Sequence, residues 1–270
     1  MALKYPFSPE LLDAMPERLA ELYRELEITL LHSIAERLII SDQLNKVTVQ
    51  QIQALRSHGI PLKEIQKAIR KATGKTREEI NKLFADVVER NQAYYNDLAD
   101  LAGITAPEMI LGAADVDAII RQTWSACRNI TGSMGFLVVQ GGRLVHLPPA
   151  RAYQWALDNA VMQIQSGAIS YGQAISSATR KLADAGLTAV EYEPKTEGGK
   201  PHYDHIDVAA RRAVMSGVNA LNQQYAVQSM DFLGTDYVEV TAHSGARDIP
   251  GPKGWEAHTE WQGRCFRWKR

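Results

Sequence analysis

The chain has 270 residues, of which 45% are hydrophobic and 23% charged, and its formal net charge is -1. This composition is that of an ordinary soluble globular protein with enough residues for one large core or two smaller ones. It excludes a generally basic nucleic-acid-binding chain, and it excludes a membrane-spanning protein, because no apolar run approaches the roughly 20 residues that cross a bilayer.

Two further observations bear on the compartment. The N-terminus lacks the basic and then apolar pattern of a signal peptide, so we expect no secretion by that route. The two cysteines, Cys127 and Cys265, match no metal or redox spacing, which indicates a reducing compartment without disulfide bonds.

The N-terminal part is predicted to be helical throughout. Ser8 followed by Pro9 is typical of an N-cap and a first helical position. Leu, Ile and Met then recur every three or four residues to about residue 40, and Pro16 either kinks this helix or marks its true start. Because only one face is apolar, we expect the helix to lie on another helix of this chain or of a neighbouring one.

Three more helices are predicted before residue 102, over 48–57, 62–71 and 77–101. We expect Thr73-Gly74-Lys75-Thr76 to separate the last two, with Thr76 as an N-cap. The Gly-Lys-Thr triplet also invites comparison with a phosphate-binding loop, but that motif needs an earlier glycine where Arg70 stands, and a preceding strand. The predicted buried face of the last helix contains Ile80, Leu83, Phe84, Val87, Tyr94, Tyr95, Leu98 and Leu101.

A linker over 106–114 leads to a mixed second part. It is predicted to contain a helix from an Asp115 N-cap to about 131, a hairpin over 136–146, and helices over 150–165 and 170–185. Two runs around a turn at 197–201 are expected to pair, followed by a helix over 207–230 with Val208 on its inward face and a strand over 237–241. The fold class is therefore predominantly α-helical α+β, with an elongated helical part over 1–112 and a small helix-and-hairpin domain over 113–270.

Unusual chemistry is concentrated between Tyr237 and Gly263. His243 and Arg247 follow the predicted strand, and His258 and Glu260 lie in the next loop. One interpretation is catalytic, with a histidine as general base, Arg247 holding an anion and Glu260 orienting His258. The other is structural, with these side chains bonding to an irregular loop. We favour the structural interpretation and assign no catalytic residue, because no nucleophile or carboxylate pair stands at a diagnostic spacing.

A metal site and a nucleic-acid contact are the other interpretations. His202 and His205 have a spacing that zinc sites use, and His243, His258 and Cys265 are further potential ligands. No second closely spaced pair completes the set, so we expect neither metal nor cofactor.

Basic residues in two places are candidate nucleic-acid contacts. The C-terminal set is Arg264, Arg267, Lys269 and Arg270, with Phe266 and Trp268 interleaved. The second set is the Arg211-Arg212 pair. The alternative is that the C-terminal cations are simply solvated and that Arg212 makes an ion pair with Asp204, Asp207 or Glu239.

Three pieces in a fixed order resemble a known family. They are Asp207-Val-Ala-Ala-Arg211-Arg212 onward to Val218, Val240-Thr-Ala-His243-Ser244-Gly245-Ala-Arg247, and His258-Thr-Glu260-Trp261-Gln262-Gly263. Together they resemble the signature of tailed-phage minor capsid proteins, whose more distant relatives are the Mu F-like head-morphogenesis proteins. The long first helix and the runs at 38–42 and 65–74 are similar as well, so the resemblance covers essentially the whole chain.

The resemblance implies a structural virion protein inside the phage head at the portal vertex, made in the host cytoplasm and assisting head assembly, DNA packaging or delivery. It implies the portal protein and other capsid or scaffold components as partners, with DNA and self-association of the N-terminal helices as further expectations. On this basis residues 1–112 would bind the portal or assembly partners, and 113–270 would be the minor-head domain.

One departure and two alternatives remain. Relatives continue past the Trp-Gln-Gly piece, whereas this chain stops seven residues after Gly263, which we interpret as a truncated product or a prophage remnant. The alternatives are a hydrolase or an ADP-ribosyltransferase-like toxin using His243, Arg247, His258 and Glu260, and a nucleic-acid-binding module.

Overall fold

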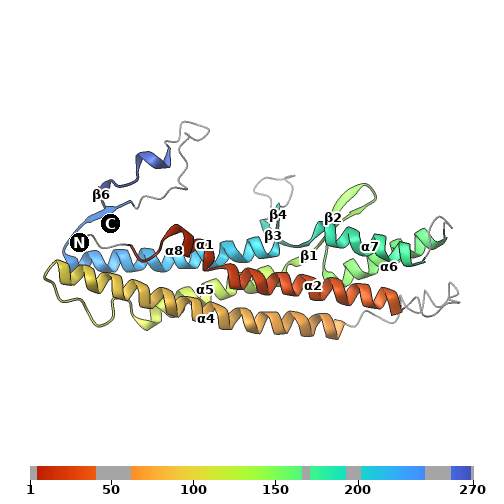
Figure 1. Ribbon diagram of the computed structural model, residues 1–270, viewed down its shortest axis with the longest axis horizontal. Coiled ribbons are helices and arrows are strands. Elements are labelled where there is room, and N and C mark those ends of the chain that lie inside the picture. Colours follow the sequence, from red (N-terminus) through yellow and green to blue (C-terminus); the bar gives the residue numbers. More distant parts are fainter. Residues whose placement is uncertain (1–4, 41–61, 166–170, 193–201, 241–256, 269–270) are drawn as a thin grey trace. The chain divides into compact units, whose positions relative to one another are not determined.

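The computed structural model describes residues 5–40, 62–165, 171–192, 202–240 and 257–268 (Figure 1). The predicted class is confirmed, because long helices dominate and the strands are short. The helices are α1 (Pro9–Ala14), α2 (Glu17–Ile40), α4 (Leu62–Leu101), α5 (Ala113–Gly132), α6 (Pro149–Gln165), α7 (Tyr171–Ala185), α8 (Ile206–Leu233) and the short 3-10 helix η1 (His258–Glu260). The strands are β1 (Met134–Gln140), β2 (Arg143–Leu147), β3 (Leu187–Tyr192), β4 (His202–His205), β5 (Tyr237–Glu239) and β6 (Cys265–Arg267).

The chain folds as two compact units. The first unit collects Met1–Met15, Asn81–Gln122 and Met215–Arg270, and the second collects Pro16–Ile80 and Thr123–Val214. One boundary falls between α1 and α2, and the others fall inside α4, α5 and α8, so each of these three helices supplies residues to both units. The boundary expected at residue 112 divides the chain by function and not by compactness, and it stays a prediction.

A four-stranded antiparallel sheet belongs to the second unit, in the order β2-β1-β3-β4. Gly141 and Gly142 both have positive φ, which suits the two-residue turn that joins β1 to β2. This hairpin and the pairing of β3 with β4 confirm both predicted strand pairs. Within β1, Phe136 and Val138 are buried.

Alanine-rich helices pack beside this sheet. α6 and α7 contact one another and β1, and α2 contacts both of these helices. The buried alanines recur every four residues, at 152, 156 and 160 in α6 and at 174 and 178 in α7, so each set forms a smooth ridge on one side of its helix. The apolar face of α2, with Leu19, Leu26 and Leu30 buried, is thus covered by helices of this chain.

Aromatic rings form much of the core of the first unit. Tyr5 makes edge contacts with Phe7 and Tyr94, and Tyr95 stacks on Tyr225 of α8 with ring centroids 6.3 Å apart. Beside the rings, the buried amide of Asn91 donates to the Asn222 side chain over 2.8 Å and to the Val87 carbonyl over 2.9 Å.

One predicted break is wrong. α4 runs without interruption from Leu62 to Leu101. Gly74 costs a helix interior only about 1 kcal/mol relative to alanine, and the Thr73 hydroxyl bonds back to the Ile69 carbonyl over 2.7 Å. Thr76, expected as an N-cap, is buried in mid-helix. A phosphate-binding loop is excluded here, because its backbone N–H groups would be committed to helical hydrogen bonds.

Smaller corrections concern helix ends and faces. Asp115 lies in the first turn of α5 and is not its N-cap. Val208, predicted on the inward face of its helix, is exposed, and the neighbouring alanines 209 and 210 of α8 are buried instead. Leu101 is exposed as well, because α4 ends there. Ser8 caps α1 as predicted, accepting from the Leu11 N–H over 3.3 Å. The helix predicted over 48–57 lies outside the described residues.

No helix in the described part of the chain combines the length and the hydropathy needed to cross a membrane.

Candidate functional site

The structure places the predicted motif residues in two separate locations. Arg211 and Arg212 lie in the first turns of α8, within the second unit, and the residues from η1 to β6 belong to the first unit. Six of the predicted positions lie outside the described residues, namely His243, Ser244, Gly245, Arg247, Lys269 and Arg270. The backbone of His258 starts η1, but its side chain is not among those described.

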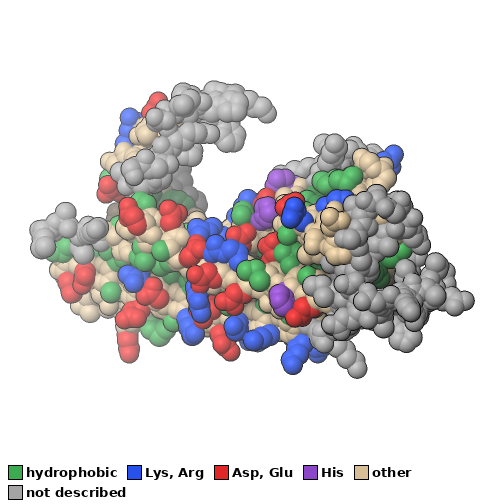
Figure 2. Space-filling model, turned by 45° about the vertical axis from the view of Figure 1, so that its right-hand side comes forward, with side chains coloured by type: hydrophobic (Ala, Val, Ile, Leu, Met, Phe, Trp, Pro, Cys, Tyr) green, Lys and Arg blue, Asp and Glu red, His purple; other side chains and the backbone are tan. Residues whose placement is uncertain are grey.

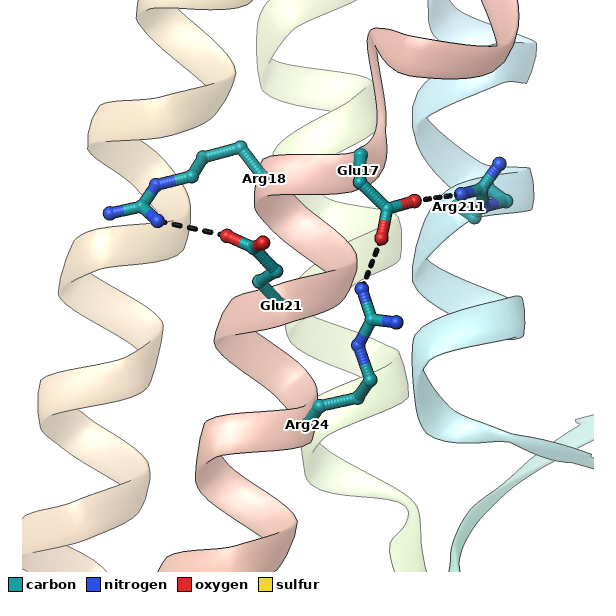
Figure 3. A network of polar contacts seen from close by, with 5 residues as sticks. All are labelled: Glu17, Arg18, Glu21, Arg24 and Arg211. Atoms are coloured by element: carbon teal, nitrogen blue, oxygen red, sulfur yellow. Dashed lines mark hydrogen bonds and ion pairs between the residues drawn. The ribbon is translucent and has the colours of Figure 1, made fainter.

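Arg211 belongs to an ion network that joins α8 to α2. Figure 3 shows the Glu17 carboxylate lying between two guanidinium groups, those of Arg24 on the same helix and Arg211 on α8. The hydrogen bond from Arg24 is the largest cause that holds the pKa of Glu17 below its ordinary value, and the charge of Arg211 adds to it. Beside it, Arg18 and Glu21 pair over 2.9 Å.

Arg212 pairs with Asp204, one of the three partners that the sequence left open. The two side chains are 2.8 Å apart, and Asp204 is only 15% exposed. The other Asp204 oxygen lies 3.0 Å from the His202 imidazole. This arrangement ties α8 to β4, so both members of the Arg-Arg pair have an architectural partner.

The C-terminal motif residues form a two-stranded antiparallel ribbon, β5–β6. Val238 pairs with Phe266, and Tyr237 pairs with Arg267. Gly263 has a φ of 68° and its N–H donates to the Val240 carbonyl over 2.8 Å. The glycine of the Trp-Gln-Gly piece is therefore needed for a left-handed turn that returns the chain alongside β5.

The ribbon exposes aromatic and cationic groups together. Trp261 contacts the Phe266 ring, with centroids 5.3 Å apart, and is 43% exposed, while Tyr237 is 61% and Trp268 38% exposed. Arg264 and Arg267 are exposed as well, and Arg267 lies 3.4 Å from Asp236. Large exposed aromatic side chains beside arginine are the residue types enriched in protein interfaces.

Of the histidines in the metal interpretation, the structure describes the side chains of His202 and His205, and these two do not form a ligand pair. Successive strand residues point to opposite faces, so His202 shares a face of β4 with Asp204 and not with His205. The His205 ring lies instead over Gly186, at the end of α7. Among the described side chains, no three potential ligands converge on a common point.

Glu17 and Arg24 are the site residues that sequence reasoning missed. Glu17 meets Arg211 across 194 residues of sequence, and local periodicity carries no signal of such a contact. Glu17 begins the first turn of α2, where a carboxylate interacts favourably with the helix N-terminus. The sequence alone therefore indicates only this interaction with its own helix.

The model of one protein family, phage minor capsid protein 2, matches residues 7–269. The chain belongs to the phage minor capsid protein 2 family. Searches of curated proteins and of solved structures each found no match. The resemblance inferred from the ordered motifs is thus confirmed, and this minor capsid protein is a structural component of a phage virion.

Proposed function

We propose that this minor capsid protein acts at the portal vertex, where it binds the portal protein and assists head assembly and DNA packaging or delivery. The match to the capsid family over residues 7–269 carries the proposal. The ion pairs of Arg211 and Arg212 support it, because they give these two family-motif residues an architectural role.

In addition to the portal or assembly contact expected of residues 1–112, we propose the β5–β6 ribbon as a surface for the portal. Tyr237, Trp261 and Trp268 are exposed large aromatic residues on one small element. Interface energy is typically concentrated in a few aromatic and arginine anchors, so such a cluster suits a protein partner.

Co-expression with the portal protein of the same phage tests this proposal. We expect the two proteins to co-purify and the minor capsid protein to enter procapsids. Because anchor residues commonly contribute at least 2 kcal/mol, Trp261→Ala with Trp268→Ala should weaken co-purification by roughly thirtyfold or more.

The matched control uses exposed apolar residues elsewhere. Leu144→Ala with Met162→Ala also removes two exposed hydrophobic side chains and should leave co-purification unchanged. Absence of the wild-type protein from both the portal complex and procapsids would count decisively against a portal role.

A second candidate function is contact with single-stranded nucleic acid through the same ribbon. The observation that favours it is the exposure of Arg264 and Arg267 next to Trp261 and Trp268, since stacking platforms beside cations are typical of single-strand binding.

A further inference from the structure

The first half of α4 carries a run of positive charge. Between residues 67 and 77 the sequence has five cations and no acid, in a chain whose net charge is only -1. The five are Lys67, Arg70, Lys71, Lys75 and Arg77, and all are exposed. We call these five residues the α4 basic face.

The continuous helix holds these cations in a fixed, one-sided array. At 1.5 Å and about 100° per residue, they extend over about 15 Å of helix length and within about 160° of its circumference. Ile65, Thr76 and Ile80 are buried, so the opposite side of the helix packs into the second unit. Gly74 lies in the middle of the array, and a Cβ placed there would meet nothing within 4 Å.

Among the side chains that the structure describes, acids compensate little of the charge of this face. Lys75 lies 3.8 Å from Glu25 of α2, with both side chains about half exposed, and such surface pairs contribute little. Arg77 lies over the Trp124 ring, 6.0 Å from its centroid, a contact that leaves its charge intact. The acids whose side chains the structure describes make no ion pair with Lys67 or Lys71. Arg24, Arg211 and Arg212 all pair with acids instead.

Figure 2 shows Lys and Arg side chains along the lower edge of the visible face, with Asp and Glu side chains among them. Gly74 stands at the centre of the α4 basic face, so no apolar side chain separates the cations there. Protein interfaces are usually centred on buried apolar or aromatic anchors, so the composition of this face favours a regular polyanion over a protein partner.

We propose that the α4 basic face binds the phosphate backbone of double-stranded DNA without sequence selectivity. A duplex carries about one negative charge per 1.7 Å of its axis, or about nine over 15 Å, which is ample for five aligned cations. The open position at Gly74 lets the backbone approach the helix closely. This contact is separate from portal binding, because it requires only the minor capsid protein and DNA.

The test is a fluorescence anisotropy titration of the purified full chain with a labelled 30-base-pair duplex of random sequence, from 50 to 200 mM KCl. We expect binding at 50 mM salt that weakens steeply as salt rises, since each neutralised phosphate adds about -0.9 to the slope of log affinity against log salt. Replacing three cations, Lys67→Gln, Arg70→Gln and Lys71→Gln, should flatten that slope by about 2.7 and lower the affinity at least tenfold. Glutamine keeps the helix propensity, and circular dichroism checks the fold.

Two variants make the result specific to this face. Arg121→Gln, Arg128→Gln and Arg143→Gln remove three exposed cations elsewhere and should retain the wild-type slope. Lys67→Arg with Lys71→Arg keeps the charge and should retain the affinity.

Four outcomes would overturn the proposal. They are no binding by the wild type at 50 mM salt, wild-type affinity and slope in the glutamine variant, an equal loss in the matched control, and loss confined to an Arg264→Gln and Arg267→Gln variant of the ribbon.

Discussion

At the scale of single residues, Tyr23 shows how polar groups are accommodated inside the second unit. Its hydroxyl is buried and lies 3.2 Å from the Cys127 carbonyl and 3.0 Å from the Thr131 hydroxyl. Burial raises the pKa of Tyr23, and the bond to Thr131 only partly opposes that shift. The phenol thus stays neutral and links α2 to α5.

Removing this hydroxyl should destabilise the fold. Tyr23→Phe leaves the Thr131 hydroxyl and the Cys127 carbonyl with one partner fewer in a buried setting, and we expect the free energy of unfolding to fall by about 1–2 kcal/mol. Urea denaturation followed by circular dichroism measures it. Tyr237→Phe, at an exposed tyrosine of the ribbon, is the control and should leave the free energy of unfolding unchanged. If both variants lost the same free energy of unfolding, the buried contacts of Tyr23 would contribute no stability beyond that of an exposed hydroxyl.

At the scale of elements, two helices end at glycines with left-handed backbones. Gly186 ends α7 with φ 69°, and Gly234 ends α8 with φ 65°. Their surroundings differ. A Cβ at Gly186 would lie 2.6 Å from the His205 ring, whereas one at Gly234 would meet nothing within 4 Å.

This difference predicts unequal costs of alanine. Gly234→Ala introduces only backbone strain and should lower the free energy of unfolding by about 1 kcal/mol. Gly186→Ala adds the displacement of His205 and should cost about 2–4 kcal/mol in total. Thermal and urea unfolding of the two variants, measured in parallel, test this prediction. If Gly186→Ala lost no more free energy of unfolding than Gly234→Ala, His205 would be able to move away freely.

Structural features that depend on a few adjacent residues could be predicted from the sequence, and features that depend on distant residues could not. The Ser8 cap, the hairpin over 136–146 and the end of a helix at residue 185 were all predicted, because each depends on a few adjacent residues. The break at Gly74 was wrong, since the packing of residues on both sides outweighs one glycine. β6 was not predicted at all, because a three-residue strand has too little pattern to be recognised apart from its partner β5.

At the scale of the whole molecule, each unit is assembled from segments far apart in the sequence. The first unit combines the N-terminus, the middle and the C-terminus of the chain, so no single cut would separate the units. The boundary at residue 112 follows a change of composition and stays a prediction about function. Composition along a chain does not report which distant segments pack together into a compact unit.

The two cysteines give a measurement on the intact chain. Both are free, Cys127 buried and Cys265 exposed, and burial raises the pKa of the Cys127 thiol to about 12. Since the thiolate is the reactive form, we expect one fast-reacting thiol in the folded protein and two in denaturant, titrated with a chromogenic disulfide reagent. Cys265→Ser should abolish the fast reaction; two fast thiols in the native wild type would show that Cys127 is accessible.

The amino-acid sequence by itself determined the helical class, the Ser8 cap, the β1–β2 hairpin and the membership of a phage minor capsid family. Propensity and capping act over a few residues, and the family motifs are linear. Only the tertiary structure decided which cations pair with the acids that it describes. Arg211 and Arg212 looked like candidate nucleic-acid contacts but are neutralised by Glu17 and Asp204, whereas Lys67 and Lys71 are exposed on α4 and pair with none of the described acids. An ion pair depends on which distant side chains the fold brings within a few ångströms, and no local pattern records that distance.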